Sequence, residues 1–417
     1  MHDVANPTSP TPKPVVTGIP GASTVESGPE DKYLKLNLGP SHPATHGTLR
    51  IYVELEGELI RDMKLEIGYL HRCFEKMCET HTWNQVIPFT DRLNYVSSMM
   101  NNVGYSMAVE KLLGIEVTPR CQRIRVIVSE LSRIIDHMVC IGANAVDLGA
   151  LTCFWYFFRE RENVYDLFEA ACGARLTTSY TRVGGLLHDL PDGWIAWCRK
   201  VIDNMPRAID DVDTMLTNNR IWIDRTKGVG AIDAATALDY GFTGPVLRAT
   251  GVAHDLRKAH PYYGYDNFQF DVAVEKGGCT YARYLVRMRE MRESLKIIRQ
   301  ALEDFPEGSV NVDDWAIVLP PKKEVYGSIE GLMAHFKLIM HGIKPPIGEV
   351  YSYTEAANGE LGFFIRSEGE GKPYRVRCRP PCFAIYQAFP EMSLGQTISD
   401  AVASLGSLNI VAGELDR

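Results

Sequence analysis

The chain has 417 residues, of which 45% are hydrophobic and 23% are charged, a composition typical of a globular protein and unlike that of a disordered or fibrous chain. Its 44 Lys and Arg against 52 Asp and Glu give a formal net charge of -8. This balance lacks the basic excess with which proteins bind phosphate backbones, so no nucleic acid partner is expected. Ten cysteines are too few for a disulfide scaffold and no secretory signal opens the chain, so we expect a reducing, cytoplasmic setting.

Residues 1–30 are rich in Pro, Thr, Ser and Gly and contain almost no large apolar side chains. Such a segment cannot bury enough apolar surface to offset the entropy lost on ordering, so a disordered tail is expected. Residues 31–70 instead alternate apolar and polar side chains, which predicts an N-terminal antiparallel β-meander. Its first connection is expected in the polar stretch 39–47.

Apolar residues recur every three or four positions through much of residues 71–345, which predicts a central bundle of long helices with inserted loops. The clearest helix is expected to begin at Thr118 and Pro119, an N-cap followed by a proline at the first helical position, and to continue to about Met138. The same spacing fills four other ranges, 91–114, 150–172, 193–217 and 280–304.

One stretch of 22 residues, 137–158, has Asp147 as its only formal charge and is long enough to span a bilayer. We expect it to be buried in protein, because a charge at the centre of a bilayer costs roughly 2.5 kcal/mol or more. Gly142, Asn144 and Gly149 near its middle favour a break into two core helices.

Residues 346–417 are predicted to form a C-terminal β-hairpin region followed by a helix at 391–405. Strands are expected at 350–353, 363–366 and 374–378, with Asn358-Gly359 as a type I′ turn. The predicted fold class is therefore α+β, with an N-terminal antiparallel β-meander, a central bundle of long helices, and a C-terminal hairpin region with a final helix.

Sequence motifs for common cofactors are missing. The chain has no GxGxxG, GxxxxGK[ST], HExxH, GxSxG or CxxC motif, so NADH, ATP and zinc have no recognisable site. Cysteines pair loosely as Cys73/Cys78 and Cys378/Cys382, but four and three intervening residues do not suit thiolates that converge on a metal. We therefore predict no metal-binding residues, because buried thiols are common as plain core residues.

Three kinds of polar side chain suggest chemistry. His42 and His46 lie four apart on a proline-containing loop, and an imidazole is a proton donor near neutral pH, although a loop histidine that only bonds a backbone group is an alternative. Asp147 in its apolar stretch needs a cation or strong donors, or else caps a helix end. Tyr95 fits either a site residue or an ordinary amphipathic core tyrosine.

Several motifs then occur together in fixed order: GPSHPATHG (39–47), YLHRCFEK (69–76), FTDRLNYVSSM (89–99), DLGALT (147–152), FRERE (158–162) and the terminal GELDR. With them the chain resembles, from about residue 32 to residue 417, the 49 kDa subunit of respiratory complex I, the NADH:quinone oxidoreductase, in which it is also called the D subunit. That family is distantly related to the large subunits of nickel–iron hydrogenases.

The resemblance implies that the chain helps to form the chamber in which quinone is reduced. It implies that His46 and Tyr95 contact the quinone headgroup and that Asp147 pairs with His46, which makes these three the expected catalytic residues. Tyr95 and a carboxylate-oriented imidazolium are donors of a suitable type for the two protons that a reduced quinone takes up.

Further roles follow from the same resemblance. Arg72 matches the family's arginine near the terminal tetranuclear cluster of the neighbouring iron–sulfur subunit, where a fixed cation raises the reduction potential. Thr177 stands where many relatives have a histidine that makes this potential depend on pH, so a less pH-dependent, lower potential suited to menaquinone is expected. Asn409 stands where relatives more often carry aspartate, which weakens any role for a carboxylate there.

The implied function is that of the quinone-site subunit of a proton-translocating enzyme, active only in the complex. No cofactor is expected on this chain, since the iron–sulfur clusters and FMN belong to partner subunits and quinone is the substrate. The implied partners are the B, C and I subunits of the complex and its membrane-embedded H subunit, with the chain peripheral at the cytoplasmic side of the inner membrane. Alternatives are a complex fed by a donor other than NADH, a hydrogenase-type large subunit, which the cysteine spacing disfavours, and a purely structural subunit.

Overall fold

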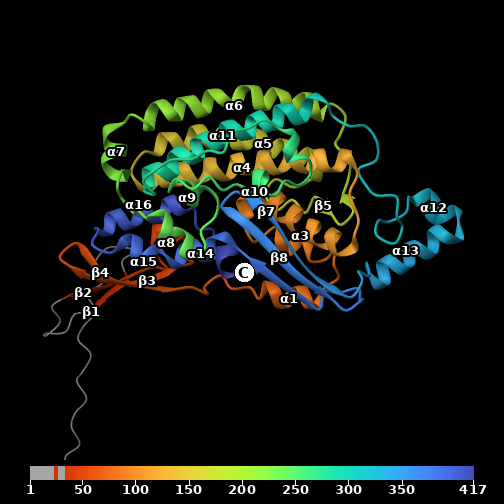
Figure 1. Cartoon of the computed structure of the whole chain (residues 1–417), viewed down its shortest axis with the longest axis horizontal. Coiled ribbons are helices and arrows are strands. Elements are labelled where there is room, and N and C mark those ends of the chain that lie inside the picture. Colours follow the sequence, from red (N-terminus) through yellow and green to blue (C-terminus); the bar gives the residue numbers. More distant parts are fainter. Residues whose placement is uncertain (1–22, 27–32) are drawn as a thin grey trace, which may run out of the picture.

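The computed structural model describes residues 23–26 and 33–417. Long helices form a layered stack on one side of the molecule, and two antiparallel sheets with short helices lie beneath it, as Figure 1 shows. The predicted α+β class is confirmed, with strands near the two ends of the chain and helices between them. A pair of helices, α12 Lys322–Gly327 and α13 Ile329–His341, projects from the body opposite the N-terminal sheet.

The predicted N-terminal meander is confirmed as an antiparallel sheet in sequence order, made of β1 Ser23–Glu26, β2 Leu34–Leu38, β3 Arg50–Glu56 and β4 Leu59–Glu66. Leu36 lies opposite Val53, which lies opposite Met63, so alternate apolar side chains share one face. The loop between β2 and β3 contains a short 3-10 helix, η1 Pro43–Thr45.

Strand β1 corrects part of the prediction for residues 1–30, because Ser23–Glu26 are paired with β2 and not disordered. Without this partner, β2 would be an edge strand with open backbone hydrogen-bonding groups. The rest of the predicted tail lies outside the described residues.

The helical stack is built mainly from four long helices, α4 packing on α5 and α11, and α6 on α5 and α11. These are α4 Pro119–Asp147, α5 Leu151–Cys172, α6 Trp194–Leu216 and α11 Thr280–Glu303. The predicted start of α4 is confirmed, since the Thr118 hydroxyl accepts a hydrogen bond from the Cys121 amide (3.3 Å) and Pro119 is the first helical residue.

The helix predicted over 91–114 begins later, as α3 Ser98–Leu113. Residues 91–94 form a turn, followed by the 3-10 helix η2 Tyr95–Ser97, because Asn94 turns its side chain back to accept hydrogen bonds from the amides of Val96 and Ser97 (3.2 and 3.4 Å). The local cap therefore outweighs the apolar spacing at this end of the range.

The apolar stretch 137–158 is broken as predicted, since α4 ends at Asp147, Gly149 has φ +90°, and α5 begins at Leu151. Within the described ranges, no helix combines the length and the apolar character needed to cross a bilayer. Its second half is not buried within this chain alone, because Leu151 and Trp155 are 51% and 63% exposed.

Short helices and one small hairpin connect these elements. They are α1 Phe74–Thr80, α2 Ile87–Thr90, β5 Thr181–Arg182, β6 Gly185–Leu186, α7 Arg220–Thr226, α8 Ala234–Asp239, α9 Gly244–Arg248, α10 Leu256–Ala259 and η3 Tyr265–Asn267. The C-terminal part follows as β7 Gly348–Ala356, β8 Gly359–Ser367, β9 Arg375–Arg379, α14 Pro381–Gln387, α15 Phe389–Ser393, α16 Ile398–Leu408 and α17 Ala412–Asp416.

The turn between β7 and β8 is not the predicted type I′ turn. Ala356 pairs with Gly359, so Ala357 and Asn358 are the central residues, and neither has a positive φ. Gly359 is needed in the strand instead, because a Cβ there would come within 2.4 Å of the Thr243 hydroxyl oxygen.

The final helix predicted at 391–405 is two helices, α15 and α16. Gly395, with φ +74°, ends the first, and Thr397 begins the second in a capping box with Asp400. The apolar period continues across this break, which is why the sequence pattern alone runs the two together.

Charged side chains are buried where α4, α9, α11 and β7 meet. Arg248 of α9 bonds Glu290 of α11 and Glu355 of β7, each at 2.8 Å, and His137 of α4 bonds Glu290 at 2.7 Å. Burial by itself would raise the pKa of Glu290, but Arg248 and His137 outweigh it and hold that pKa well below its usual range. These bonds fix the three helices and the sheet relative to one another.

We predict that Arg248→Met lowers the free energy of unfolding by about 3–5 kcal/mol, because two buried carboxylates lose their cation. Urea unfolding of the purified chain would measure this. Arg220→Met is the matched control, since Arg220 is exposed and, within the described part of the chain, pairs only with Asp224 on the same helix. A change below about 0.5 kcal/mol is expected there. An equally small change for Arg248→Met would contradict the prediction.

Candidate functional site

The residues predicted as catalytic come together in one pocket of about 240 Å³. His46 comes from the loop after β2, Tyr95 from η2, and Asp147 from the last turn of α4. The remaining wall is formed by α4 and by the end of α16 and the residues that follow it. The other lining residues are Ala44, Thr48, Leu49, Val96, Val139, Cys140, Ala143, Asn144, Leu405, Gly406, Asn409, Ile410, Val411 and Ala412.

The two histidines of the loop have different surroundings. The His42 ring accepts a hydrogen bond from the Ala44 amide (3.2 Å) and so caps η1, which matches the alternative of a histidine that bonds the backbone. His46 has a left-handed backbone (φ 52°), is exposed, and its ring makes no hydrogen bond with any described residue. Of the two, only His46 lines the pocket.

Asp147 lies at the end of α4, yet its side chain caps no backbone group in the described structure. The surrounding protein raises its pKa above the usual range, and His46 and then His42 act in the opposite direction. Among the described residues, no hydrogen bond or ion pair within 4 Å joins Asp147 to His46, so the two interact through space across the pocket. The direct pairing implied by the resemblance is not made in this conformation.

Tyr95 opens the 3-10 helix η2 and is 39% exposed, which does not fit an ordinary core tyrosine. Burial of the hydroxyl raises its pKa, Cys382 and Asp136 raise it further, and Arg72 lowers it. Tyr95 therefore stays a neutral hydroxyl, able to donate a proton, over the physiological pH range.

Asn409 forms part of the pocket wall and also has a left-handed backbone (φ 55°). Its side-chain amide donates hydrogen bonds to Asp136 and to Asn358, both at 2.5 Å. Asp136 is buried and accepts a second hydrogen bond from Asn94 at 2.9 Å. The Asp136 carboxylate on α4 is thus hydrogen-bonded directly to Asn409 in the pocket wall.

Sequence reasoning missed Asp136. The available signal was an acidic residue among the apolar positions of the helix predicted from Thr118, where a side chain is expected to be buried. Its partners could not be named, because Asn94 and Asn409 are far away in the chain.

Arg72 lies beside a second, mainly apolar pocket of about 420 Å³. Its guanidinium donates to the carbonyls of Arg92 (2.6 Å) and Gly413 (2.9 Å), and burial and then the charge of Arg92 lower its pKa. Within the described part of the chain, neither arginine has a carboxylate within 4 Å. Arg92, which sequence reasoning also missed, is thus a second unneutralised cation here. The apolar lining is Phe74, Met77, Pro88 and Phe89.

Thr177 does not line the pocket of Tyr95. It lies half-buried in the loop after α5, between Leu176 and Thr178. The Ser98 hydroxyl at the start of α3 bonds the Leu176 carbonyl (2.6 Å) and the Thr178 hydroxyl (3.2 Å), so this loop is held against the end of η2.

The C-terminal motif GELDR holds the Arg72 segment in place. The Asp416 carboxylate accepts hydrogen bonds from the amides of Gly68 (3.0 Å) and Leu70 (2.8 Å), and the Arg417 carbonyl accepts one from the amide of Arg72 (3.1 Å). Gly413 touches the Arg92 carbonyl so closely that a Cβ would come within 2.5 Å of it.

The four cysteines weighed as metal ligands are free thiols, of which Cys73 is exposed and Cys78, Cys378 and Cys382 are buried. Across residues 23–26 and 33–417, no group of three or more His, Cys, Asp or Glu side chains is placed to hold a metal ion. The Cys382 thiol donates instead to the Asn409 carbonyl (3.6 Å).

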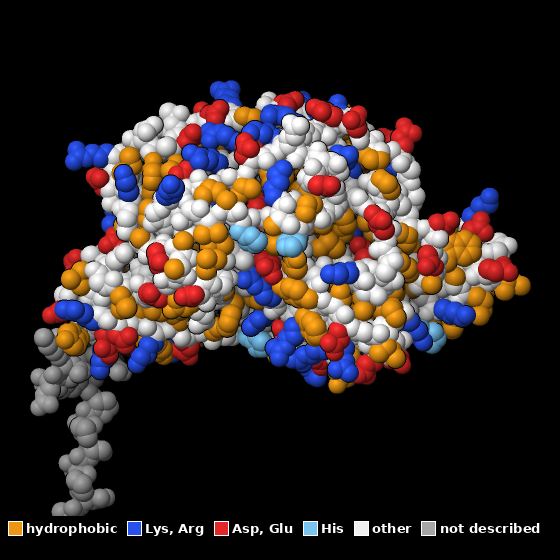
Figure 2. Space-filling view, in the orientation of Figure 1, with side chains coloured by type: hydrophobic (Ala, Val, Ile, Leu, Met, Phe, Trp, Pro, Cys, Tyr) orange, Lys and Arg blue, Asp and Glu red, His pale blue; other side chains and the backbone are white. Residues whose placement is uncertain are grey.

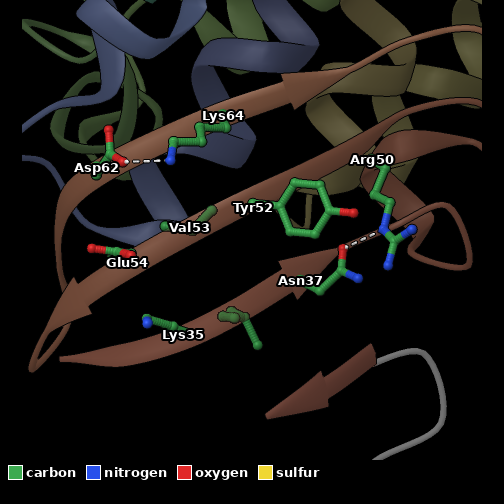
Figure 3. Close-up of a pocket in the computed structure, with 9 residues that line it drawn as sticks. Lys35, Asn37, Arg50, Tyr52, Val53, Glu54, Asp62 and Lys64 are labelled. Carbon is green, nitrogen blue, oxygen red and sulfur yellow. Dashed lines mark hydrogen bonds and ion pairs between the residues drawn. The ribbon is translucent and has the colours of Figure 1, made fainter. Parts of the chain in front are cut away.

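A further hollow of about 310 Å³ lies on the N-terminal sheet. Figure 3 shows its polar side chains lying along β2, β3 and β4 and bonded to each other, with Arg50 on Asn37 (3.2 Å) and Lys64 near Asp62 (3.9 Å). Arg50 and Lys64 thus interact with other side chains of the same hollow. None of the predicted site residues lines it.

Comparison with known proteins gives the family. The model of the family described as respiratory-chain NADH dehydrogenase, 49 Kd subunit, matches residues 147–417, more than half of the chain. The chain belongs to this family, as the sequence resemblance predicted.

Three relatives are similar over most of their length. The NADH-quinone oxidoreductase D subunit of Myxococcus xanthus is 49% identical over all of both chains. The same-named protein of Geobacter sulfurreducens is 50% identical over 92% of this chain and 98% of its own. The NADH-quinone oxidoreductase C/D subunit of Bdellovibrio bacteriovorus is 57% identical over 93% of this chain and 69% of its own.

We predict that Asn409→Asp destabilises the chain at pH 8 by about 1–3 kcal/mol, because it places a second carboxylate against buried Asp136. The loss should shrink at pH 5, where protonation relieves the repulsion. Exchanging the two residues, as Asp136→Asn with Asn409→Asp, should recover most of the stability, because the amide–carboxylate bond is restored.

Urea unfolding at both pH values would measure these differences. The control Asn218→Asp changes an exposed asparagine and should stay within about 0.5 kcal/mol of the parent. A single variant as stable as the parent at pH 8, or an exchange that recovers nothing, would contradict the prediction.

Proposed function

We propose that this chain is the quinone-site subunit in the peripheral arm of a proton-translocating NADH:quinone oxidoreductase, complex I. In this proposal it receives electrons from the terminal cluster of the neighbouring iron–sulfur subunit, passes them to quinone and supplies protons to the reduced ring. The observation that carries the proposal is that His46, Tyr95 and Asp147, from three separate segments, line one pocket.

The pocket offers suitable proton chemistry. Two-electron reduction of a quinone requires two protons, one for each oxygen, and the Tyr95 hydroxyl and a protonated His46 are neutral and cationic donors for them. His46 and Asp147 interact electrostatically across the pocket, and this interaction lowers the pKa of the Asp147 carboxyl against the effect of burial. Once both protons have left, Asp147 faces a neutral ring, which is a change of charge that the protein can couple to other events.

The second pocket supports the proposed electron entry. Arg72 and Arg92 present positive charge beside an apolar hollow, and no carboxylate of the described chain lies within 4 Å of either, although Asp416 acts on Arg72 from farther away. Arg72 also acts on Tyr95. An anionic iron–sulfur cluster on a docked partner would supply the missing negative charge, and the arginines would raise its potential. Figure 2 shows Lys and Arg gathered along the lower edge near α1. Of those that line a hollow there, Lys76 and Arg375 pair with Glu79, and Arg377 pairs with Glu75, so this edge adds less free positive charge than Arg72 and Arg92.

The rest of the assembly belongs to the same proposal. The B, C and I subunits and the membrane-embedded H subunit of complex I are the proposed neighbours, with the iron–sulfur clusters and FMN held by partner subunits and quinone arriving from the bilayer. The chain would then be peripheral, on the cytoplasmic side of the inner membrane. The exposed Leu151 and Trp155 at the start of α5, beside Asp147, suit contact with such a neighbour.

We predict that Tyr95→Phe lowers the NADH:quinone reductase activity of membranes at least about tenfold, because one positioned proton donor is lost. NADH:ferricyanide activity, which bypasses the quinone site, should not change. Tyr326→Phe, which removes a hydroxyl from an 88% exposed tyrosine on α12, is the matched control and should leave both rates unchanged. Full quinone reduction by Tyr95→Phe would overturn the headgroup assignment, and absence of both activities in the parent would point to a donor other than NADH.

We predict that Thr177→His makes the midpoint potential of the terminal cluster depend on pH, by up to about 59 mV per pH unit for a one-electron couple linked to one proton. The parent, with no titratable group at this position, should show a flatter dependence. Redox titration of the assembled complex at pH 6 and pH 8, followed by the cluster's paramagnetic signal, would measure both. A parent whose midpoint potential depends on pH as steeply as that of the variant would contradict the prediction. Thr214→His, which places a histidine at an exposed position, is the control and should behave as the parent.

A further inference from the structure

A carboxyl group is buried behind the pocket wall and has no role in the proposed mechanism. Glu414 of α17 is 1% exposed, and no Lys, Arg or His of the described chain lies within 4 Å of its carboxylate. One of its oxygens accepts a hydrogen bond from the amide of Cys382 (3.1 Å). A buried carboxylate with one neutral donor and no cation is costly, so the protonated form is favoured.

The groups that face Glu414 come from three elements besides its own. Asp136 of α4 and Cys378 of β9 disfavour the ionised form of Glu414, and Arg379 of β9 favours that form from a distance. Cys382 of α14 contacts the Glu414 carboxyl through both its amide and its thiol. Burial is the largest influence and, with Asp136, raises the pKa of Glu414 to about 7. Glu414 therefore takes up and loses a proton in the range in which the protein works.

A short path leads from Glu414 to the pocket. Ala412, two residues before Glu414, lines the pocket, and the Cys382 thiol lies between Glu414 and the Asn409 carbonyl (3.6 Å) in the pocket wall. Cys382 and Asp136 both act on Tyr95. The Cys382 residue thus contacts both the buried Glu414 carboxyl and the Asn409 carbonyl, and Asn409 lines the same pocket as Tyr95.

We propose that Glu414 is a proton reserve for Tyr95, which holds a proton beneath the pocket at neutral pH and returns it through the Cys382 thiol after Tyr95 has donated to quinone. This inference rests on the proposed function, since it needs Tyr95 to act as a donor. The capacity to hold the proton is a property of the buried carboxyl and its neighbours, and it exists whatever ligand the pocket binds.

The proposed step is balanced in protons. The Tyr95 O–H bond breaks as its proton joins a quinone oxygen, while the electrons come from the cluster of the proposed partner subunit. The Cys382 S–H proton then passes to the tyrosinate oxygen, and the Glu414 O–H proton passes to the thiolate. Glu414 is left as a carboxylate, and a proton from water restores it before the next turnover.

The first test is infrared difference spectroscopy on the parent complex in membranes. It should show a protonated-carboxyl C=O band that titrates with a midpoint near 7 and that is missing in Glu414→Gln. A parent complex without such a band overturns the inference, whatever any variant does, so the result does not depend on how well the variants fold.

The second test is kinetic. Glu414→Gln should lower NADH:quinone reductase activity at least about tenfold with ferricyanide activity unchanged, and the decline of the parent's rate above pH 7 should disappear. Glu414→Asp should keep that decline and restore part of the rate, because it still titrates. Exposed Glu330→Gln of α13 is the matched control and should behave as the parent.

Variants of the thiol test the path. Cys382→Ser keeps an exchangeable proton and should retain most of the activity, whereas Cys382→Ala should resemble Glu414→Gln. Cys198→Ala, which removes a buried thiol from α6, controls for the loss of packing.

The outcomes separate this inference from the proposed function. If Tyr95→Phe lowers quinone reduction but Glu414→Gln keeps the parent's rate and pH profile, the reserve is wrong and the quinone site stands. If Tyr95→Phe has no effect either, the proposed function fails. If Glu414→Gln also loses ferricyanide activity, the complex has not assembled and the parent's infrared titration decides.

Discussion

The site depends on the close insertion of the C-terminal segment 411–417 between two earlier segments of the chain. Gly413 has no Cβ and so lies against the backbone of Arg92. The Asp416 carboxylate accepts hydrogen bonds from the amides of Gly68 and Leu70, just before Arg72. This single insertion places Arg72, the turn that leads to Tyr95, and one wall of the pocket. Hydrogen bonds hold this segment in place, and a buried donor or acceptor left without its partner would cost free energy.

Local sequence signals identified those parts of the fold and site that depend on local structure. The long helices, the meander and the loop of His46 follow from periodicity, caps and turn residues. Asp147 and Tyr95 were candidates from the sequence pattern, and the resemblance supplied their roles. The partners of Asp136 and Glu414 could not be found this way, because they lie far along the chain. The buried pairing of Arg248 with two acidic residues escaped notice for the same reason.

The errors in the predicted elements have two physical causes: tertiary contacts outweigh local preference, and local caps end or begin helices where the apolar period continues. Asn358 and Gly359 have the composition of a type I′ turn, but Asn358 instead bonds the Asn409 carbonyl (3.1 Å) and Gly359 packs on Thr243. The C-terminal apolar period likewise suggested one helix, whereas the capping box at Thr397 begins a new one.

Helix α4 carries both Asp136, in the buried amide cluster, and Asp147, at the pocket mouth. At 1.5 Å per residue, the backbone positions of Asp136 and Asp147 are about 17 Å apart along the helix axis. Helix α4 therefore fixes the distance between the buried Asp136 and the exposed Asp147. A shift or tilt of α4 would therefore displace Asp136 and Asp147 together.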